Sequence, residues 1–348
     1  MKKALANYIS GLPLRRVHVL HDRKITLRVI NDEFEAIKVE WKKPGETDGW
    51  QPANREERFR FRKGIETAVH VLYVCDLPHG ECIVQRETDD EYHLFKVSGK
   101  ADRNERRPPS GIITYGADVE CLVVRRGSHR LVPASQWLRR NGAIGYDDAV
   151  ALKGNKVLRP IVELRPEPAA DGDQLFINVS KLYVRLEQFL RKNGLCAVSE
   201  GRGRLSLGGH LHIGGVRPSF SLVRRLDVFL ALPMALIEPG DPTMRRKRFG
   251  RFGSVRANDF DGFEYRVLAS WYDRIPELLP MFRWFCYLVR HYDRLPYLSF
   301  STTILESYNA HSIDLLKETA ACLEGICADM LPADDYKCIA TPFFRLLR

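Results

Sequence analysis

Four short stretches of the sequence carry two polar side chains separated by one hydrophobic residue. They are Asp118-Val-Glu120, Glu163-Leu-Arg165, His210-Leu-His212 and Glu264-Tyr-Arg266. Because side chains alternate between the two faces of a β-strand, each pair would share one face and leave its hydrophobe on the other. Ionised groups gathered on one sheet face need partners, since an isolated buried ion costs several kcal/mol. The four pairs therefore predict one polar site that holds a cation and phosphate groups.

The residue types in these pairs suit a metal-bound polyphosphate. Mg²⁺ prefers carboxylate and phosphate oxygens and tolerates an imidazole. Arginine binds phosphate with two parallel hydrogen bonds and stays charged at every relevant pH. Arginines stand just before the fourth pair, at positions 245, 246, 248, 251 and 256. This clustering favours a phosphate-binding site near Glu264.

Each motif also has a plainer interpretation when it is taken alone. A carboxylate pair fits a solvated strand face, and a Glu–Arg pair fits an ion pair that contributes little when exposed. A lone His-x-His motif fits a structural role, although glycine pairs flank it here and glycine lets a backbone approach a ligand closely. The basic run 245–248 fits a solvated loop or a nucleic-acid patch. The ordered set of motifs favours the shared site.

Length and composition bound the class of protein. The chain has 348 residues, which predicts one large domain or two, and 45% of them are hydrophobic, which is enough for a sizeable core. The formal charge of +10 favours an anionic partner such as a nucleotide, a nucleic acid or an acidic polymer. Eight cysteines without CxxC spacing are typical of buried residues in a reducing compartment, with zinc or a disulfide framework as the minor alternative.

The sequence indicates no targeting or membrane segment. The N-terminal residues MKKALANYISGLPLRR lack the run and cleavage site of a signal peptide. The longest apolar run, Leu226–Ile237, contains Asp227 and is too short to span a bilayer. We therefore expect a cytoplasmic protein with no membrane partner.

Residues 1–107 alternate β-rich runs with polar turns, which predicts a small all-β N-terminal domain. The expected strands are Val17–Leu20, Ile25–Ile30, Ala36–Trp41, Thr67–Val74, Glu81–Gln85 and Tyr92–Val97. The charged, proline-bearing segment Asp102–Ser110 predicts the boundary to a second domain, residues 108–348. Nothing in the first domain indicates its role.

The second domain mixes strands and helices. Its expected strands are Ile112–Val124 with a break at Gly116–Asp118, a hairpin of Gly145–Lys153 and Lys156–Arg165 through Gly154 and Asn155, Leu205–Ile213 and Gly262–Leu268. Helices are expected at Asp173–Asn193, which Gly194 ends, and at Ser219–Ile237. The last 75 residues are expected to form helices broken at prolines.

The ordered motifs resemble those of the carboxylate–amine ligases of the glutamine synthetase/glutamate–cysteine ligase superfamily, and most of all the phage-type carboxylate–amine ligases, type 2 (amidoligases). The motifs are Gly116-Ala-Asp-Val-Glu120, Glu163-Leu-Arg-Pro166, Gly209-His-Leu-His-Ile-Gly214, Arg248-x-Gly250 and Gly262-Phe-Glu-Tyr-Arg266. The resemblance covers about residues 110–275, and the N-terminal domain and the C-terminal helices lie outside it. The resemblance implies an α+β fold, with a glutamine synthetase-like curved antiparallel sheet and helices on its outer face.

The resemblance also implies the chemistry. Ligases of this superfamily use ATP: a substrate carboxylate attacks the γ-phosphate to give an acyl phosphate, and an amine then displaces the phosphate to leave an amide. The phage-type group is linked to the modification of cell-wall peptides and spore-coat proteins, which implies a peptide or protein substrate. The acid, the amine and the oligomeric state stay open.

Site residues carry over from the family position by position. The implied ligands of two or three Mg²⁺ ions are Glu120, Glu163, His210 or His212, and Glu264. The implied phosphate-binding residues are Arg248, Arg251, Arg256 and Arg266, of which the last two would act on the transferring phosphoryl group. Asp118 stands where glutamate–cysteine ligases have a glutamate, and its role stays open.

Three other functions compete with the ligase. One is a binding or scaffold protein on the same fold without turnover. Another is a nucleic-acid-binding protein that uses the basic loop 245–251, for which affinity would fall steeply with salt. The third is a zinc hydrolase built on His210 and His212, which would need no ATP. Neither of the common nucleotide-binding motifs, GxxxxGK[ST] or GxGxxG, occurs in the chain.

Overall fold

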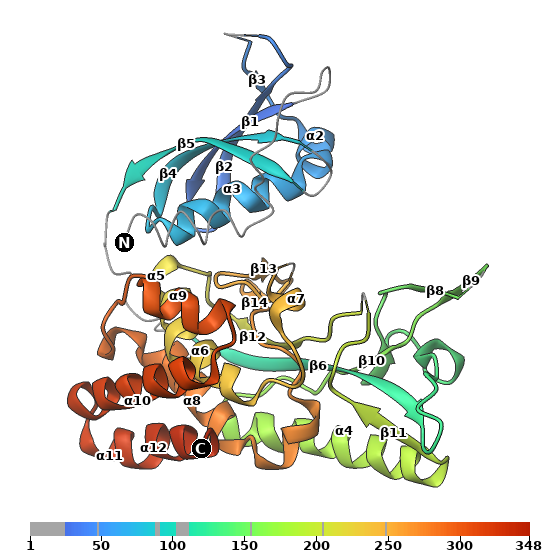
Figure 1. Ribbon diagram of the computed structural model, residues 1–348. Coiled ribbons are helices and arrows are strands. Elements are labelled where there is room, and N and C mark those ends of the chain that lie inside the picture. Colours follow the sequence, from blue (N-terminus) through green and yellow to red (C-terminus); the bar gives the residue numbers. More distant parts are fainter. Residues whose placement is uncertain are drawn as a thin grey trace. The chain divides into compact units, whose positions relative to one another are not determined.

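The computed structural model describes residues 25–46, 49–87, 91–101, 111–153, 155–203, 205–247 and 249–348. The chain divides into two compact units (Figure 1). Unit 1 comprises Met1–Arg106, Pro218–Arg224 and Leu298–Leu305, and unit 2 comprises Arg107–Arg217, Arg225–Tyr297 and Glu306–Arg348. The expected strand Val17–Leu20 and the expected boundary Asp102–Ser110 lie outside the described residues.

Unit 1 is built on a five-stranded antiparallel sheet in the order β3-β2-β1-β4-β5. Its elements are β1 (Thr26–Asp32), β2 (Glu35–Lys42), β3 (Gln51–Pro52), α2 (Arg55–Arg60), α3 (Arg62–Val74), β4 (His79–Arg86) and β5 (Tyr92–Lys100). Helix α3 packs on β1 and β4, and the alternate residues Leu27 and Val29 of β1 are buried. Four of the expected strands in this unit are confirmed.

One expected strand of unit 1 is wrong. Residues Thr67–Val74 lie in α3, and all of them are buried. A helix that is buried all round produces a continuous apolar run, which periodicity alone does not distinguish from a buried strand. The β-branched and aromatic residues of this run then favoured the strand. The N-terminal domain is therefore a sheet with helices, and the expectation that it contains only strands is corrected.

Unit 2 contains an antiparallel sheet in the order β13-β14-β12-β6-β10-β7, and β11 also pairs with β6. Its strands are β6 (Thr114–Arg125), β7 (Ile144–Tyr146), β10 (Ile161–Leu164), β11 (Leu195–Val198), β12 (Gly209–Gly214), β13 (Val255–Ala257) and β14 (Phe263–Tyr265). The expected break in the first strand is absent, because Gly116 keeps the register by pairing with His212. The strand expected from Leu205 begins only at Gly209.

Helices cover one face of this sheet (Figure 1). The helical elements from residue 172 onward are α4 (Gly172–Lys192), α5 (Phe220–Leu226), the π-helical turn η2 (Asp227–Ala231), α6 (Leu232–Met234), η3 (Ala235–Ile237), α7 (Thr243–Arg246), η4 (Tyr272–Glu277), α8 (Leu279–His291), η5 (Tyr292–Arg294), α9 (Thr302–Asn309), α10 (Ile313–Met330), α11 (Ala333–Asp335), η6 (Tyr336–Ala340) and α12 (Thr341–Leu346). Helix α4 packs on β6, β10 and β11, and Tyr115 of β6 donates a hydrogen bond to the Cys286 carbonyl of α8 (3.3 Å). The α+β fold with an antiparallel sheet and helices on its outer face is confirmed.

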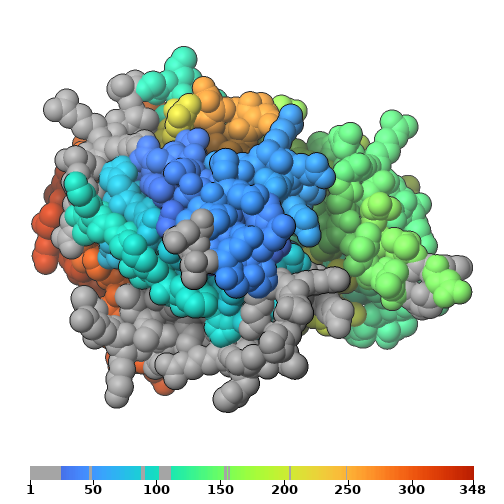
Figure 2. All heavy atoms as spheres, turned by 90° about the horizontal axis from the view of Figure 1, so that it is seen from above, coloured from blue at the N-terminus to red at the C-terminus, as the bar shows by residue number. Residues whose placement is uncertain are grey.

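The expected hairpin is present as β8 (Ala151–Lys153) paired with β9 (Lys156–Leu158), next to the pairing of β7 with β10. Its segment, drawn in green, projects at the edge of unit 2 in both Figure 1 and Figure 2. Leu152 and Val157 face each other across the hairpin and are 76% and 59% exposed. No helix among the described residues is long and apolar enough to cross a membrane.

Asp171 caps α4, because its Oδ1 accepts a hydrogen bond from the Gln174 amide (2.8 Å). We expect Asp171→Ala to lower the free energy of unfolding by about 1 kcal/mol, since a helix N-terminal amide loses its partner. Asp171→Asn should restore most of that stability, because asparagine caps equally well. Urea denaturation measures both, and equal losses in the two variants would contradict the capping role.

Candidate active site

The strand register brings the polar pairs onto one face of the unit 2 sheet. His210 of β12 lies directly opposite Asp118 of β6, and Glu163 of β10 lies directly opposite Glu120 of β6. Residues that are directly opposite share a face, and so do residues two apart on one strand. Three adjacent strands therefore present these four side chains to the same side.

The same face continues to the other edge of the sheet. Glu264 of β14 lies opposite His212 of β12, and Arg256 of β13 lies opposite Glu264. Arg266 follows the end of β14, but its amide still donates to the Ser254 carbonyl (2.9 Å). The face sharing expected for the four pairs is found in the structure, and Arg256 joins it.

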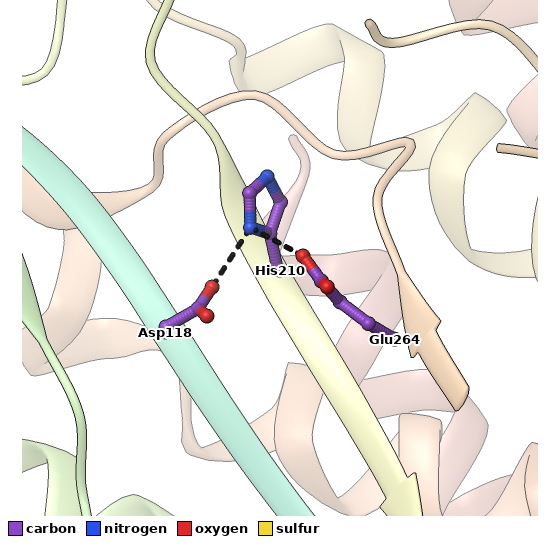
Figure 3. Close-up of side chains that lie close together, drawn as sticks. All are labelled: Asp118, His210 and Glu264. Carbon is purple, nitrogen blue, oxygen red and sulfur yellow. Dashed lines mark ion pairs between the residues drawn. The ribbon is translucent and has the colours of Figure 1, made fainter. Parts of the chain in front are cut away.

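His210 is the junction of the site. Its Nδ1 lies 2.9 Å from Asp118 Oδ1 and 2.9 Å from Glu264 Oε1 (Figure 3). One ligand atom from each of these three residues lies within 4.8 Å of the others, and no cluster other than this one is found among the described residues. His212 Nε2 lies 3.0 Å from the second oxygen of Asp118. Asp118, to which the sequence assigned no role, therefore contacts both histidines.

Two adjacent glycines make room for the junction. A Cβ at Gly208 would overlap the His210 imidazole, and a Cβ at Gly209 would overlap the Trp271 indole. The Gly208 amide also donates to Glu120 Oε2 (2.6 Å), which holds that carboxylate on the sheet. The glycine pair was visible in the sequence, but its contacts with Glu120 and Trp271 were not.

Glu163 has a charged partner directly after its own strand. It forms an ion pair with Arg165, whose Nη1 donates to the Arg140 carbonyl (2.9 Å). A Cβ at Gly145 of β7 would overlap the Arg165 guanidinium, so glycine is needed opposite Glu163. The pair is partly buried and is not the exposed surface pair of the plainer interpretation.

The electrostatics of the junction favour a positive charge on His210. Burial lowers the pKa of His210, but hydrogen bonds to Asp118 and Glu264 outweigh it and raise the pKa to about 9. Burial raises the pKa of Glu264, but His210 and Arg266 outweigh it and hold that pKa below its usual value. The same balance, with both histidines as partners, lowers the pKa of Asp118.

The other two carboxylates shift in the opposite direction. Burial raises the pKa of Glu163 to about 8, the negative charge of Asp118 adds to the rise, and Arg165 opposes it. Burial also raises the pKa of Glu120. Protons thus neutralise a face that is rich in carboxylates. Carboxylate oxygens and an imidazole nitrogen are also a suitable donor set for a hard divalent cation.

The structure separates the arginines into two groups. Arg256 lies 2.5 Å and Arg266 lies 3.0 Å from Glu264, with side chains 62% and 32% exposed. Arg245 and Arg246 are buried. Arg245 donates to the Val267 carbonyl, and Arg246 bonds to Glu238 and to the Tyr308 carbonyl. The interpretation of the basic run as a solvated or nucleic-acid-binding loop is therefore wrong for Arg245 and Arg246.

Two of the expected phosphate-binding residues, Arg248 and Arg251, stay untested. Arg251 is half-buried in the loop between α7 and β13. Arg248 lies outside the described residues. Their role in nucleotide binding stays a prediction.

A sequence model of the family described as phage phiEco32-like COOH·NH2 ligase-type 2 matches residues 115–346. The chain belongs to this family. Membership makes the protein a carboxylate–amine ligase, and the matched residues include every site residue described above. A solved structure titled "Apo GmaS without ligand" is similar, with a TM-score of 0.38, 11% sequence identity and coverage of 92% of this chain and 91% of that chain. No curated protein sequence matches the ligase.

The glycine next to the junction gives a test of its geometry. We expect Gly208→Ala to weaken Mn²⁺ binding by about tenfold or more, because the new Cβ displaces the His210 imidazole. Electron paramagnetic resonance of free Mn²⁺ measures the affinity. Gly325→Ala is the matched control, since a Cβ there meets nothing within 4 Å. Equal affinities in the two variants would show that His210 does not take part in binding.

The raised pKa values predict how stability depends on pH in metal-free protein. A group whose pKa is raised on folding stabilises the protein fully below its unfolded pKa, and this contribution is lost as pH rises through the folded pKa. His210 (about 9) and Glu163 (about 8) both act in this direction. These two contributions should therefore lower the melting temperature as the pH rises from about 4.5, where Glu163 ionises in the unfolded chain, to about 9, where folded His210 loses its proton. Glu163→Gln should make that fall shallower, and an unchanged profile would contradict the assignment.

Proposed function

We propose that the ligase is ATP- and Mg²⁺-dependent and that it activates its carboxylate substrate as an acyl phosphate. The observation that carries this proposal is the placement of Arg256 and Arg266 on Glu264, beside the cluster of Asp118, His210 and Glu264. Donors for a cation and donors for phosphate oxygens thus meet at one side chain. Phosphoryl transfer needs this combination, because its catalysis consists of positioning and charge neutralisation.

The cations would be held at two places on the sheet. Asp118, His210 and Glu264 offer one set of ligand atoms, and Glu120 and Glu163, opposite each other on β6 and β10, offer another. His210 is favoured over His212 because its ring nitrogen faces two carboxylates. A divalent cation bound there would neutralise phosphate oxygens and the developing charge on the leaving group.

In the proposed reaction, an oxygen of the substrate carboxylate attacks the γ-phosphorus of ATP and ADP leaves. The nitrogen of an amine then attacks the acyl carbon, phosphate leaves, and the amine loses a proton. Arg256 and Arg266 would bind the transferring phosphoryl group with charge-assisted hydrogen bonds. Arg248 and Arg251 would bind the rest of the polyphosphate.

We propose a peptide or protein as substrate, as the family resemblance implies, and residues 108–348 as the part of the chain that carries the reaction. A formal charge of +10 suits an acidic acceptor. We place the reaction in the cytoplasm, where ATP is supplied.

Replacement of the metal-binding carboxylates tests the proposal. We expect Glu264→Ala and Glu163→Ala each to weaken binding of Mg²⁺ with a non-hydrolysable ATP analogue by about 100-fold, because each substitution removes a buried carboxyl group that would hold the cation. Isothermal titration calorimetry measures binding, and circular dichroism checks the fold. Asp173→Ala, which removes a half-exposed carboxylate paired with Arg283, is the control and should bind normally.

Crystals soaked with Mn²⁺ and the ATP analogue locate the ions directly. We expect anomalous density beside His210 and Glu264, and nucleotide phosphates beside Arg256 and Arg266. Nucleotide affinity without ATP-dependent turnover on any tested acid and amine would favour the scaffold alternative. Ions bound away from the sheet face would overturn the proposed site.

A further inference from the structure

The segment that carries Arg256 and Arg266 is held by charged side chains buried below it. Tyr265 is the last residue of β14 and stands between Glu264 and Arg266 in the sequence, so its side chain points to the opposite, helix-covered face. Two charged residues from the helical part of unit 2, Arg245 and Asp227, bond to this segment. Neither residue belongs to the four polar pairs of the site face, and the family motifs assign a role to neither.

Arg245 holds the backbone of Arg266. It belongs to α7, is 7% exposed, and donates from Nη2 to the Arg266 carbonyl (3.0 Å) and from Nη1 to the Val267 carbonyl (2.6 Å). A Cβ at Gly250 would overlap the Arg245 guanidinium, so glycine makes room for it. The Arg266 amide donates to Ser254, and Arg266 is therefore held at both its amide and its carbonyl.

Asp227 bonds to β14 and to the loop that leads into β13. It is 0% exposed, its Oδ1 accepts a hydrogen bond from the Tyr265 hydroxyl (2.7 Å), and its Oδ2 accepts one from the Gly253 amide (2.7 Å). Gly253 has φ +75°, a left-handed conformation that favours glycine, and it leads into β13 and Arg256. One carboxylate thus joins the entry to β13 with the last residue of β14.

We propose that Arg245 and Asp227 are positioning residues, which set where Arg256 and Arg266 meet the phosphates of the nucleotide. This inference rests on the proposed function. Phosphoryl transfer is sensitive to displacements of about 1 Å. Burying a guanidinium and a carboxylate costs desolvation free energy, so a gain in stability is a poor explanation for these two residues. Arginine is needed at position 245 because its planar fork bonds to two carbonyls at once, which a lysine ammonium does not reproduce.

The test compares two buried arginines that differ in what they hold. We expect Arg245→Lys to weaken binding of Mg²⁺ with the non-hydrolysable ATP analogue by about tenfold. Arg225→Lys is the matched control, because Arg225 is 1% exposed and donates from two nitrogens to the Leu295 carbonyl. It should lose similar stability and keep its affinity within about twofold. Equal losses of affinity would overturn the proposal.

A double-mutant cycle shows whether Arg245 acts through Arg266. In an Arg266→Ala background, Arg245→Lys should weaken binding no further, because the side chain that it positions is gone. Additive losses would mean that Arg245 affects the site in some other way, and would overturn the positioning role. If Arg245 had only a structural role, Arg245→Lys would lower the melting temperature in both backgrounds, and its effect on nucleotide binding would not depend on Arg266.

A milder variant covers the case in which Arg245→Lys does not fold. Tyr265→Phe removes only the hydroxyl that bonds to Asp227, and it should weaken nucleotide binding by about threefold to tenfold. Normal binding by folded Tyr265→Phe would then overturn the inference while leaving the proposed function intact. If wild-type protein fails to bind the nucleotide with Mg²⁺, the proposed function fails, and this inference fails with it.

Discussion

Four carboxylates on one face of one sheet are the constraint on which the site depends. Asp118, Glu120, Glu163 and Glu264 are each at least partly buried, and ionised carboxylates so close together are unstable unless cations lie between them. Three arginines and a histidine with a raised pKa provide that charge. Protonated His210 and a divalent cation would contact the same carboxylate oxygens. Positive charge therefore offsets the carboxylates both without a metal and with one.

The shared sheet face was predictable from sequence because a strand has a period of two. Pairs such as His210 and His212 had to share a face wherever their strand lay, and the antiparallel order of the sheet brought separate pairs together. Helix α4 was predictable for a similar reason, since apolar spacing and Gly194 mark its extent. What spacing could not provide was the register between strands, which placed Asp118 opposite His210.

The failures also have physical reasons. The run Thr67–Val74 was mistaken for a strand because burial on all sides removes the periodic signal of a helix. Arg245 and Arg246 looked like a solvated basic loop, because a sequence does not show which arginines will meet backbone carbonyls in the interior. The space that Gly208 leaves for His210 depends on three-dimensional contact and carries no periodic signature. Local patterns thus predicted which groups share a face, and tertiary packing decided which groups are held below it.

The position of the site residues on β-strands also limits where the chain can gain or lose residues. One residue inserted into β6 upstream of Asp118 would slip the register and turn Asp118 and Glu120 toward the helices. The hairpin β8–β9 has no such restriction, because it pairs with itself at the edge of the unit. Insertions and deletions among homologues should therefore collect between residues 147 and 160, and codon-scale indels within the strands of the site should be eliminated by selection.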